Sequence, residues 1–247
     1  MMRENLPKSW NKKALPHKFC PGCGQSQALR ILGFALDELA IQDKTVYATD
    51  IGCSLLSWNL FNVDTIQTHH GRATPVAVGF KQVRPEAVVI SFMGDGGGYA
   101  IGAQHLVNSC LRNDPITCIL INNANYAMTG GQLAPTTLPL QKTDTTPEGR
   151  PENLFSRPIL GPEMLSEIAA EDAYLARGTS FDIENCLTLF KKALQNQIDG
   201  RGFSFVEVLS ACPVNWKTNA KGSIDFVNKM KEFFPLGEIK IKTNNKL

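Results

Sequence analysis

The sequence AVVISFMGDGGGY, residues 87–99, decides the fold. Its first seven residues, Ala87 to Met93, are almost entirely apolar and do not alternate with polar residues. This pattern is typical of a central strand that is buried on both faces of a parallel sheet. A glycine-rich turn follows the strand, and a helix-like segment follows the turn. In open parallel sheets ligands bind beyond the carboxyl ends of the strands, so the turn at residues 94–98 is the first candidate for a binding site.

The same alternation of apolar, β-rich segments with helix-like segments continues on both sides of this stretch. Further strands are predicted at residues 45–49, 116–122, 174–177 and 203–209. Helices are predicted at residues 25–39, 74–83, 100–112, 162–171 and 183–197. The pattern predicts an α/β fold with a mostly parallel sheet flanked by helices.

We expect one domain over residues 1–247, with a Cys-x-x-Cys segment near its N-terminus and a C-terminal arm. Residues 133–157 are rich in Pro, Thr and charge without a clear period, which predicts a long loop of the kind that is often functional. From Asn215 onward the chain has a helical piece and a basic tail, which fit an interface arm and a surface helix equally well.

Composition excludes several classes of protein. Hydrophobic residues make up 43% and charged residues 19% of the chain, and the net charge is +2, so neither nucleic acid nor a membrane is expected as a partner. No apolar run reaches the length of a membrane helix, and the basic N-terminus is not followed by a signal-peptide core. We expect a cytoplasmic location. The seven cysteines therefore serve metal binding, redox chemistry or packing.

The turn Gly94-Asp95-Gly96 does not fit a dinucleotide fingerprint, because Tyr99 stands where that motif needs its last glycine. Asp95 would also repel a phosphate unless a divalent cation lay between them. We therefore predict a metal-bridged diphosphate with Asp95 as an oxygen ligand of Mg²⁺. A second ligand is available at the end of the next strand, where Asn122 and Asn123 stand, the latter 28 residues beyond Asp95. A lone Gly-Asp-Gly would more often be a turn with a helix cap.

The order Gly-Asp-Gly, helix, strand, Asn-Asn resembles the diphosphate-binding motif of thiamine-diphosphate enzymes. The resemblance implies that Asp95, the side chain of Asn123 and the backbone carbonyl of Asn125 are ligands of Mg²⁺. It also implies that Gly94 and Gly96 let the chain approach the diphosphate.

The cysteines fall into two groups. Cys110 and Cys186 lie on apolar helix faces and Cys118 lies in an apolar strand, so packing is expected for these three. The other four lie in turns: Cys20, Cys23, Cys53 and Cys212. Four thiolates that meet at one edge of a sheet suit a [4Fe–4S] cluster or a zinc ion, and the cysteines alone do not distinguish the two.

The motifs taken together resemble the β subunits of 2-oxoacid:ferredoxin oxidoreductases. They are, in chain order, CPGCG, GCS, HHGRATPVAVGFK, GDGGGYAIGAQHL, NNANYAMTGGQLAPTT and ACP, between residues 20 and 213. The resemblance implies that Cys20, Cys23, Cys53 and Cys212 hold a [4Fe–4S] cluster close to thiamine diphosphate. It assigns the cofactor contacts to Ile51, Gly52, Cys53, Ser54, His70, Gly71, Arg72, Gly94, Asp95, Gly96, Gly97, Asn123, Asn125, Tyr126, Ala127, Met128 and Thr129.

The activity that the resemblance implies is the oxidative decarboxylation of a 2-oxoacid with coenzyme A, giving an acyl-CoA and CO₂. Electrons would pass through the cluster to ferredoxin. The activating Glu is expected from an α subunit with a pyrimidine-binding domain, in an assembly that leaves room for γ and δ subunits, and no catalytic residue is assigned to this chain. The run after Cys53 lacks a basic residue, which favours a branched or aromatic 2-oxoacid such as 2-oxoisovalerate.

Two other functions remain open at this stage. A non-redox thiamine-diphosphate decarboxylase or synthase subunit would share the Gly-Asp-Gly motif, but would leave the four loop cysteines without a common role. A zinc or electron-transfer module without catalysis would use the cysteines, but would leave the pairing of Asp95 with Asn123 unexplained.

Overall fold

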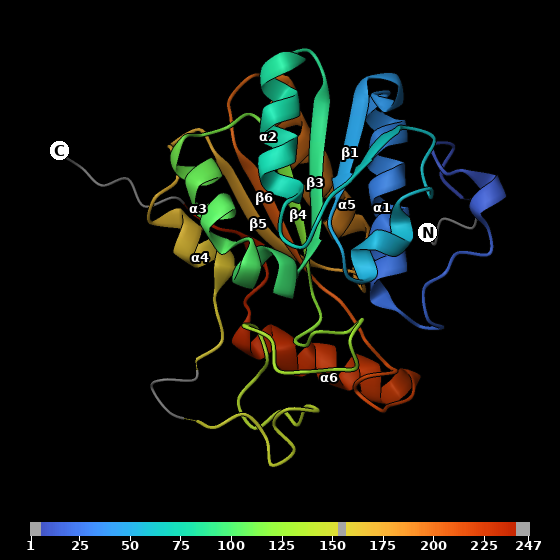
Figure 1. Cartoon of the computed structure of the whole chain (residues 1–247), viewed down its shortest axis with the longest axis vertical. Coiled ribbons are helices and arrows are strands. Elements are labelled where there is room, and N and C mark those ends of the chain that lie inside the picture. The colour runs from blue at the N-terminus through green and yellow to red at the C-terminus, as the bar shows by residue number, and fades with distance from the viewer. Residues whose placement is uncertain (1–5, 153–156, 241–247) are drawn as a thin grey trace.

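The computed structural model describes residues 6–152 and 157–240, and its centre is a seven-stranded sheet (Figure 1). The strand order is β2-β1-β3-β4-β6-β5-β7, and all neighbours are parallel except β7, which runs antiparallel to β5. The strands are β1 (Thr45–Thr49), β2 (Asp64–Gln67), β3 (Val88–Gly94), β4 (Thr117–Asn122), β5 (Tyr174–Thr179), β6 (Ser204–Leu209) and β7 (Gly237–Glu238). The predicted α/β fold with a mostly parallel sheet is confirmed.

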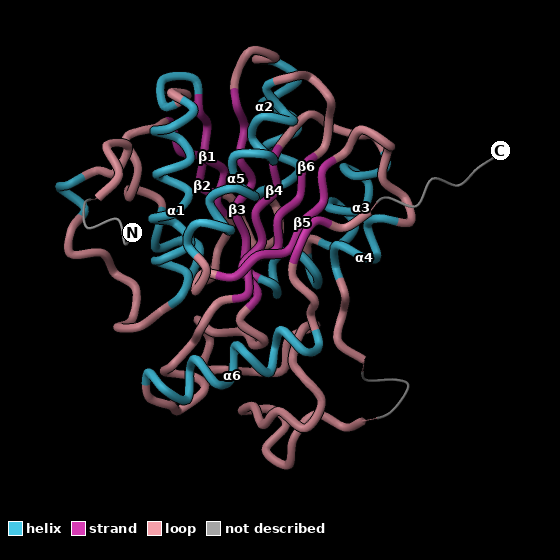
Figure 2. Tube along the Cα trace, turned by 180° about the vertical axis from the view of Figure 1, so that it is seen from behind, coloured by secondary structure: helices cyan, strands magenta, loops and turns pink. Residues whose placement is uncertain are grey.

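Helices cover both faces of the sheet (Figures 1 and 2). The α-helices are α1 (Gly24–Leu39), α2 (Ala73–Val83), α3 (Ala103–Leu111), α4 (Gly161–Ser166), α5 (Ile183–Ile198) and α6 (Ala220–Phe233). Short helical turns stand at Lys12–Ala14, Gln42–Lys44, Cys53–Ser57 and Gly97–Ile101. Helices α1 and α5 pack on one face, while α2, α3 and α4 pack on the other.

Strand β3 shows why the sequence lacks an alternating pattern here. Ile90 and Phe92 pack into the core under α1 and α5, while Val89 and Met93 pack into the core on the opposite face. Because both faces are covered by helices, apolar side chains are favoured at every position. The glycine turn is thereby fixed at the end of a strand in the middle of the sheet.

Several element boundaries differ from the predictions. Helix α4 ends at Ser166 instead of Glu171, and a π-helical turn at Gly97–Ile101 precedes α3 where one continuous helix is predicted. The strands β2 and β7 are absent from the predictions. Both lie at sheet edges, where β2 is polar and only partly buried and β7 is two residues long, so neither has the apolar signal of a buried strand.

Helix α6 lies across the carboxyl edge of the sheet, below the other helices in Figure 1. Its side chains Val227 and Met230, with Phe234 just beyond its end, form a third core cluster with Ala124 of the turn after β4. Helix α6 thus packs on the loops of the binding edge, while β7 beyond it pairs with β5 at the side of the sheet. Residues 241–247 of the predicted basic tail lie outside the described residues.

The remaining predictions concern packing, the long loop and membrane helices. Cys110, Cys118 and Cys186 are fully buried in the two main core clusters, as predicted. Residues 133–152 contain no helix and no named strand, in agreement with the predicted loop, whose residues 153–156 lie outside the described residues. Across residues 6–152 and 157–240, no helix combines the length and apolar character that a bilayer crossing demands.

Candidate functional site

A cavity of about 450 Å³ opens at the carboxyl edge of the sheet. The strand ends meet there in register: Gly94 pairs with Ile121, and Asn122 pairs with Leu209. The cavity is lined by Gln25, Ile51, Gly52, Cys53, Ser54, His70, Gly94, Asp95, Gly96, Gly97, Ala100, Ile101, Asn123, Asn125, Tyr126, Ala127, Met128 and Thr129. Four segments predicted separately from motifs therefore form one site.

Two predicted contact residues, Gly71 and Arg72, do not line this cavity. The backbone N–H of Gly71 instead donates to the carboxylate of Asp50 at 3.1 Å. The guanidinium of Arg72 donates to the backbone carbonyls of His70 and Ile101, at 3.4 and 3.3 Å. Both residues therefore hold the loops that form the rim, and their contact with a cofactor stays a prediction.

Asp95 supplies the carboxylate predicted at the end of β3. Its Oδ1 accepts from the backbone N–H of Gly96 at 2.8 Å, and its Oδ2 accepts from the hydroxyl of Thr136 at 2.5 Å. Burial raises the pKa of Asp95 to about 7, against the lowering by these two donors. A carboxylate buried in this way gains strongly from a nearby cation, because the cation replaces the lost solvation.

Asn123 supplies a second candidate oxygen ligand. Its Oδ1 is buried and has no hydrogen-bond partner among the described residues. The side-chain amide of Asn125 donates to the carbonyl of Asn123 at 2.8 Å, so the Asn125 side chain is engaged within the turn. The Asp95 carboxylate and the side-chain oxygen of Asn123 follow adjacent strands, and the Asn123 oxygen has no donor among the described residues. Both are hard oxygen ligands of the kind that Mg²⁺ prefers. The residues present therefore fit a metal-bridged diphosphate.

The glycines of the turn fit the same ligand. A side chain at Gly96 would overlap the ring of Tyr126, which shows that Tyr126 closes over the turn. A Cβ at Gly94 would meet no atom within 4 Å, although Gly94 lines the cavity. The space above Gly94 is therefore open to a bound ligand.

Asp50 is a site residue that the sequence analysis missed. It is fully buried at the end of β1, where its Oδ1 accepts from the hydroxyl of Ser54 at 2.6 Å and its Oδ2 accepts from the N–H of Gly71. A side chain at Gly97 would collide with Asp50 Oδ2. The Asp50 carboxylate therefore hydrogen bonds to the loop of Cys53 and to the loop of His70, and it packs against the glycine turn. Its position directly after a predicted strand is the signal that could have identified it.

The four loop cysteines converge on one side of the cavity. Burial, together with smaller contributions from the thiols of Cys23, Cys212 and Cys20, raises the pKa of Cys53 to about 12. Burial likewise raises the pKa of Cys23 to about 11, although backbone N–H groups at the start of α1 point at its sulfur. The thiols of Cys23, Cys53 and Cys212 therefore lie close enough to affect one another and to be affected by Cys20.

The described thiols do not form a compact set around a single ion. Over the described parts of the chain, no set of three or more His, Cys, Asp or Glu side chains closes around a single ion. A zinc site requires such a compact tetrahedral set. A four-iron cluster occupies more space, so its four ligating thiolates stand farther apart and can come from separate loops.

Three further residues line the cavity without having been predicted: Gln25, Ala100 and Ile101. Gln25 is the most informative, because it is almost fully buried and its Nε2 finds no partner within residues 6–152 and 157–240. Its position two residues after Cys23, at the start of α1, was the available signal. Ala100 and Ile101 belong to the π-helical turn, which the sequence did not reveal.

The segment after Cys212 joins the thiol region to the turn after β4. The side-chain amide of Asn215 donates to the carbonyl of Ala127 at 2.7 Å, and the indole N–H of Trp216 donates to the carbonyl of Asn123 at 3.1 Å. The loop that carries one thiol and the turn that carries the candidate metal ligands are therefore held to each other directly.

Comparison with known proteins agrees with this geometry. Residues 50–208 match the family model described as thiamine pyrophosphate enzyme, C-terminal TPP binding domain. The chain is 36% identical over 222 residues to the ketoisovalerate oxidoreductase subunit VorA of Methanothermobacter thermautotrophicus, covering 88% of this chain and 46% of that protein. It is 38% identical over 220 residues to the 2-oxoglutarate synthase subunit KorB of Archaeoglobus fulgidus, covering 89% of this chain and 78% of that one. The chain thus spans less than half of the VorA relative.

Among solved structures, the chain is similar to the 2-oxoglutarate:ferredoxin oxidoreductase from Magnetococcus marinus with 2-oxoglutarate, coenzyme A and succinyl-CoA bound. The TM-score is 0.79 at 31% sequence identity, over 92% of this chain and 74% of that one. Fold and sequence therefore agree on one family.

Proposed function

The chain belongs to the β-subunit family of the 2-oxoacid:ferredoxin oxidoreductases, and on this premise we propose that it binds thiamine diphosphate, Mg²⁺ and a [4Fe–4S] cluster. The proposed reaction is the oxidative decarboxylation of a 2-oxoacid with coenzyme A to an acyl-CoA and CO₂, with ferredoxin as electron acceptor. The observation that carries the proposal is the buried Asp95 carboxylate beside the unpartnered Oδ1 of Asn123, in a cavity that also includes Cys53.

Each group of residues has a defined part in this proposal. Asp95, the Asn123 side chain and the Asn125 carbonyl hold Mg²⁺, and Gly94 and Gly96 leave room for the diphosphate. Thiamine diphosphate supplies, when bound, the electron sink for loss of CO₂. The thiols of Cys20, Cys23, Cys53 and Cys212 hold the cluster at the neighbouring wall. The activating Glu comes from a partner subunit with a pyrimidine-binding domain.

The substrate we propose is a branched or aromatic 2-oxoacid. Ile51, Ile101 and Met128 give the cavity an apolar side, and its lining contains no Lys or Arg in the described residues. An additional substrate carboxylate placed against such a wall would be left without a partner, at a large desolvation cost. A dicarboxylic 2-oxoacid such as 2-oxoglutarate is therefore disfavoured unless the partner subunit supplies a cation.

The proposal is tested by anaerobic purification, analysis of iron and acid-labile sulfide, and EPR spectroscopy after reduction with dithionite. About four irons per chain and the signal of a reduced cluster are expected. Zinc at the cysteines, or no metal in the folded protein, would favour a zinc module or a non-redox thiamine-diphosphate enzyme instead.

Two further measurements separate the remaining possibilities. Asp95→Ala is expected to abolish thiamine-diphosphate binding while the iron content stays unchanged, and a zinc or electron-transfer module predicts no such loss. With the partner subunit present, 2-oxoisovalerate is expected to reduce ferredoxin faster than 2-oxoglutarate, and the opposite order would contradict the substrate assignment. The chain without its partner is expected to show negligible turnover.

A further inference from the structure

We propose that Asn122 and Glu207 are positioning residues for the turn at residues 123–125, and that Glu207 fixes the orientation of the Asn122 amide. The inference rests on the proposed function in one respect, because it takes this turn to hold the Mg²⁺ of thiamine diphosphate. Neither residue lines the cavity, and both are fully buried behind it.

The turn has a backbone conformation that requires support. Ala124 has a φ of 56°, in the left-handed region, which a residue with a side chain adopts only where its surroundings enforce it. The left-handed residue lies between Asn123 and Asn125, so it determines how both face the cavity. The N–H of Ala124 donates to Oδ1 of Asn122 at 3.1 Å. This bond links the side chain at the end of β4 to the backbone of the turn.

The orientation of the Asn122 amide decides whether this bond can form. An amide has an accepting end and a donating end, and only the accepting end can satisfy the N–H of Ala124. The other end, Nδ2, donates to Oε1 of Glu207 at 2.8 Å. Because a carboxylate only accepts, Glu207 requires Nδ2 to face it and thereby directs Oδ1 toward Ala124. The carboxylate on β6 thus selects the amide orientation that the turn needs.

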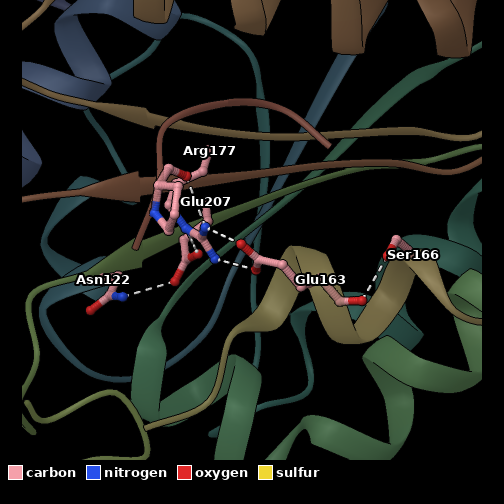
Figure 3. A network of polar contacts seen from close by, with 6 residues as sticks. Asn122, Glu163, Ser166, Arg177 and Glu207 are labelled. Atoms are coloured by element: carbon pink, nitrogen blue, oxygen red, sulfur yellow. Dashed lines mark hydrogen bonds and ion pairs between the residues drawn. The ribbon is translucent and has the colours of Figure 1, made fainter. Parts of the chain in front are cut away.

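Glu207 is itself held in place by an ion pair with Arg177 (Figure 3). Its Oε2 accepts from Nε of Arg177 at 2.5 Å, and Arg177 also contacts both carboxylate oxygens of Glu163 at 2.6 Å and the carbonyl of Pro235 at 3.0 Å. Burial raises the pKa of Glu207, and the Arg177 guanidinium opposes that rise. The charged network therefore leaves Glu207 one fixed accepting oxygen for Asn122.

The test exchanges the polar groups of the pair. In Glu207→Gln the new amide can donate to Asn122, so the orientation of Asn122 is no longer determined. In Asn122→Asp two carboxylates face each other. In the double variant, the amide introduced on β6 can donate to the carboxylate introduced on β4, and that carboxylate can again accept from the N–H of Ala124. Loss in each single variant and recovery in the double variant is a pattern that general destabilisation does not produce.

The measurement is the Mg²⁺ dissociation constant at saturating thiamine diphosphate, by calorimetry after removal of metal with a chelator. The protein is the complex purified through a tag on this chain, at a temperature where every variant is folded. Each single variant is expected to bind Mg²⁺ on the order of 10- to 100-fold more weakly, as is typical for residues that support metal ligands. The double variant is expected to recover most of this loss.

Glu163→Gln is the matched control. It weakens the same Arg177 network from the side of α4, where Glu163 is partly exposed, but leaves the contact between Asn122 and Glu207 intact. It is expected to lower the unfolding temperature without changing Mg²⁺ affinity. If the wild type binds Mg²⁺ and both single variants bind it equally well, the positioning role is overturned while the proposed function stands. If the wild type does not bind Mg²⁺ with thiamine diphosphate, both are overturned.

Discussion

Replacing Gly94 by alanine separates the folding role of this glycine from its proposed role in diphosphate binding. Gly94 is the last residue of β3 and does not have a positive φ, so its backbone accommodates an alanine. The added Cβ would meet no protein atom within 4 Å. Because Gly94 lines the cavity, the methyl group would enter the space assigned to the diphosphate.

The expected magnitudes follow from these two observations. An alanine at a compatible position stabilises the protein by about 0.4–1 kcal/mol, because it restricts the unfolded chain. A methyl group forced into a filled site costs about 1–3 kcal/mol, which corresponds to a roughly 5- to 150-fold loss of thiamine-diphosphate affinity. Gly94→Ala should therefore unfold at the same temperature or higher, yet bind the cofactor much more weakly.

The assay combines urea unfolding with calorimetric titration of thiamine diphosphate in the presence of Mg²⁺. Gly79→Ala, on an exposed position of α2 with no atom within 4 Å of its Cβ, is the control that should gain stability and retain binding. Gly96→Ala should lose both, because its Cβ would overlap the Tyr126 ring. Undiminished cofactor affinity in Gly94→Ala would refute the proposal that the diphosphate lies over Gly94. Strong destabilisation of Gly94→Ala would refute the finding that the space around its Cβ is open.

Three shorter predictions test other parts of the site. Cys53→Ser should lose most of the iron, whereas Cys118→Ser, in the core, should retain it, as measured by iron and sulfide analysis. Burial raises the pKa of Asp50 above its ordinary value of 3.8, so the carboxyl group should contribute stability at low pH that is lost as pH rises through the folded pKa. Asp50→Asn should flatten this pH dependence in urea unfolding without ligands. Gly161→Ala would overlap the hydroxyl of buried Tyr99 and should lower stability by about 1–3 kcal/mol, and a neutral effect on the unfolding temperature would contradict this packing.

The sequence was sufficient to predict the site where local chemistry and strand position coincide. Asp95 and Asn123 each follow a strand that is mostly apolar, and the carboxyl ends of parallel strands meet at one edge. The charge of Asp95 in a glycine turn then led to the prediction of a cation. These inferences use only neighbouring residues and one rule of sheet topology, which is why they could be made before any coordinates.

The residues that the sequence did not reveal act through contacts between distant segments. Asp50 is isolated in the sequence and gains its role only because Ser54, Gly71 and Gly97 surround it in space. Glu207 stands inside an otherwise apolar strand, where a single charge gives no indication of its partner. Arg177 lies 30 residues earlier, on the neighbouring strand. No periodicity encodes such a pair.

The contacts of residues 215 and 216 bear on how the two parts of the proposed site act together. A protein that passes electrons from one bound cofactor to another must hold the two cofactors at a fixed separation. Cys212 is followed closely by Asn215 and Trp216, which hydrogen bond to the carbonyls of Ala127 and Asn123. The loop that would hold the cluster is thus attached to the turn that would hold Mg²⁺, by bonds that do not pass through the sheet. Helix α6 packs on that same turn through the core cluster around Ala124. In the proposed function, this helix would therefore help to fix the separation of the two groups.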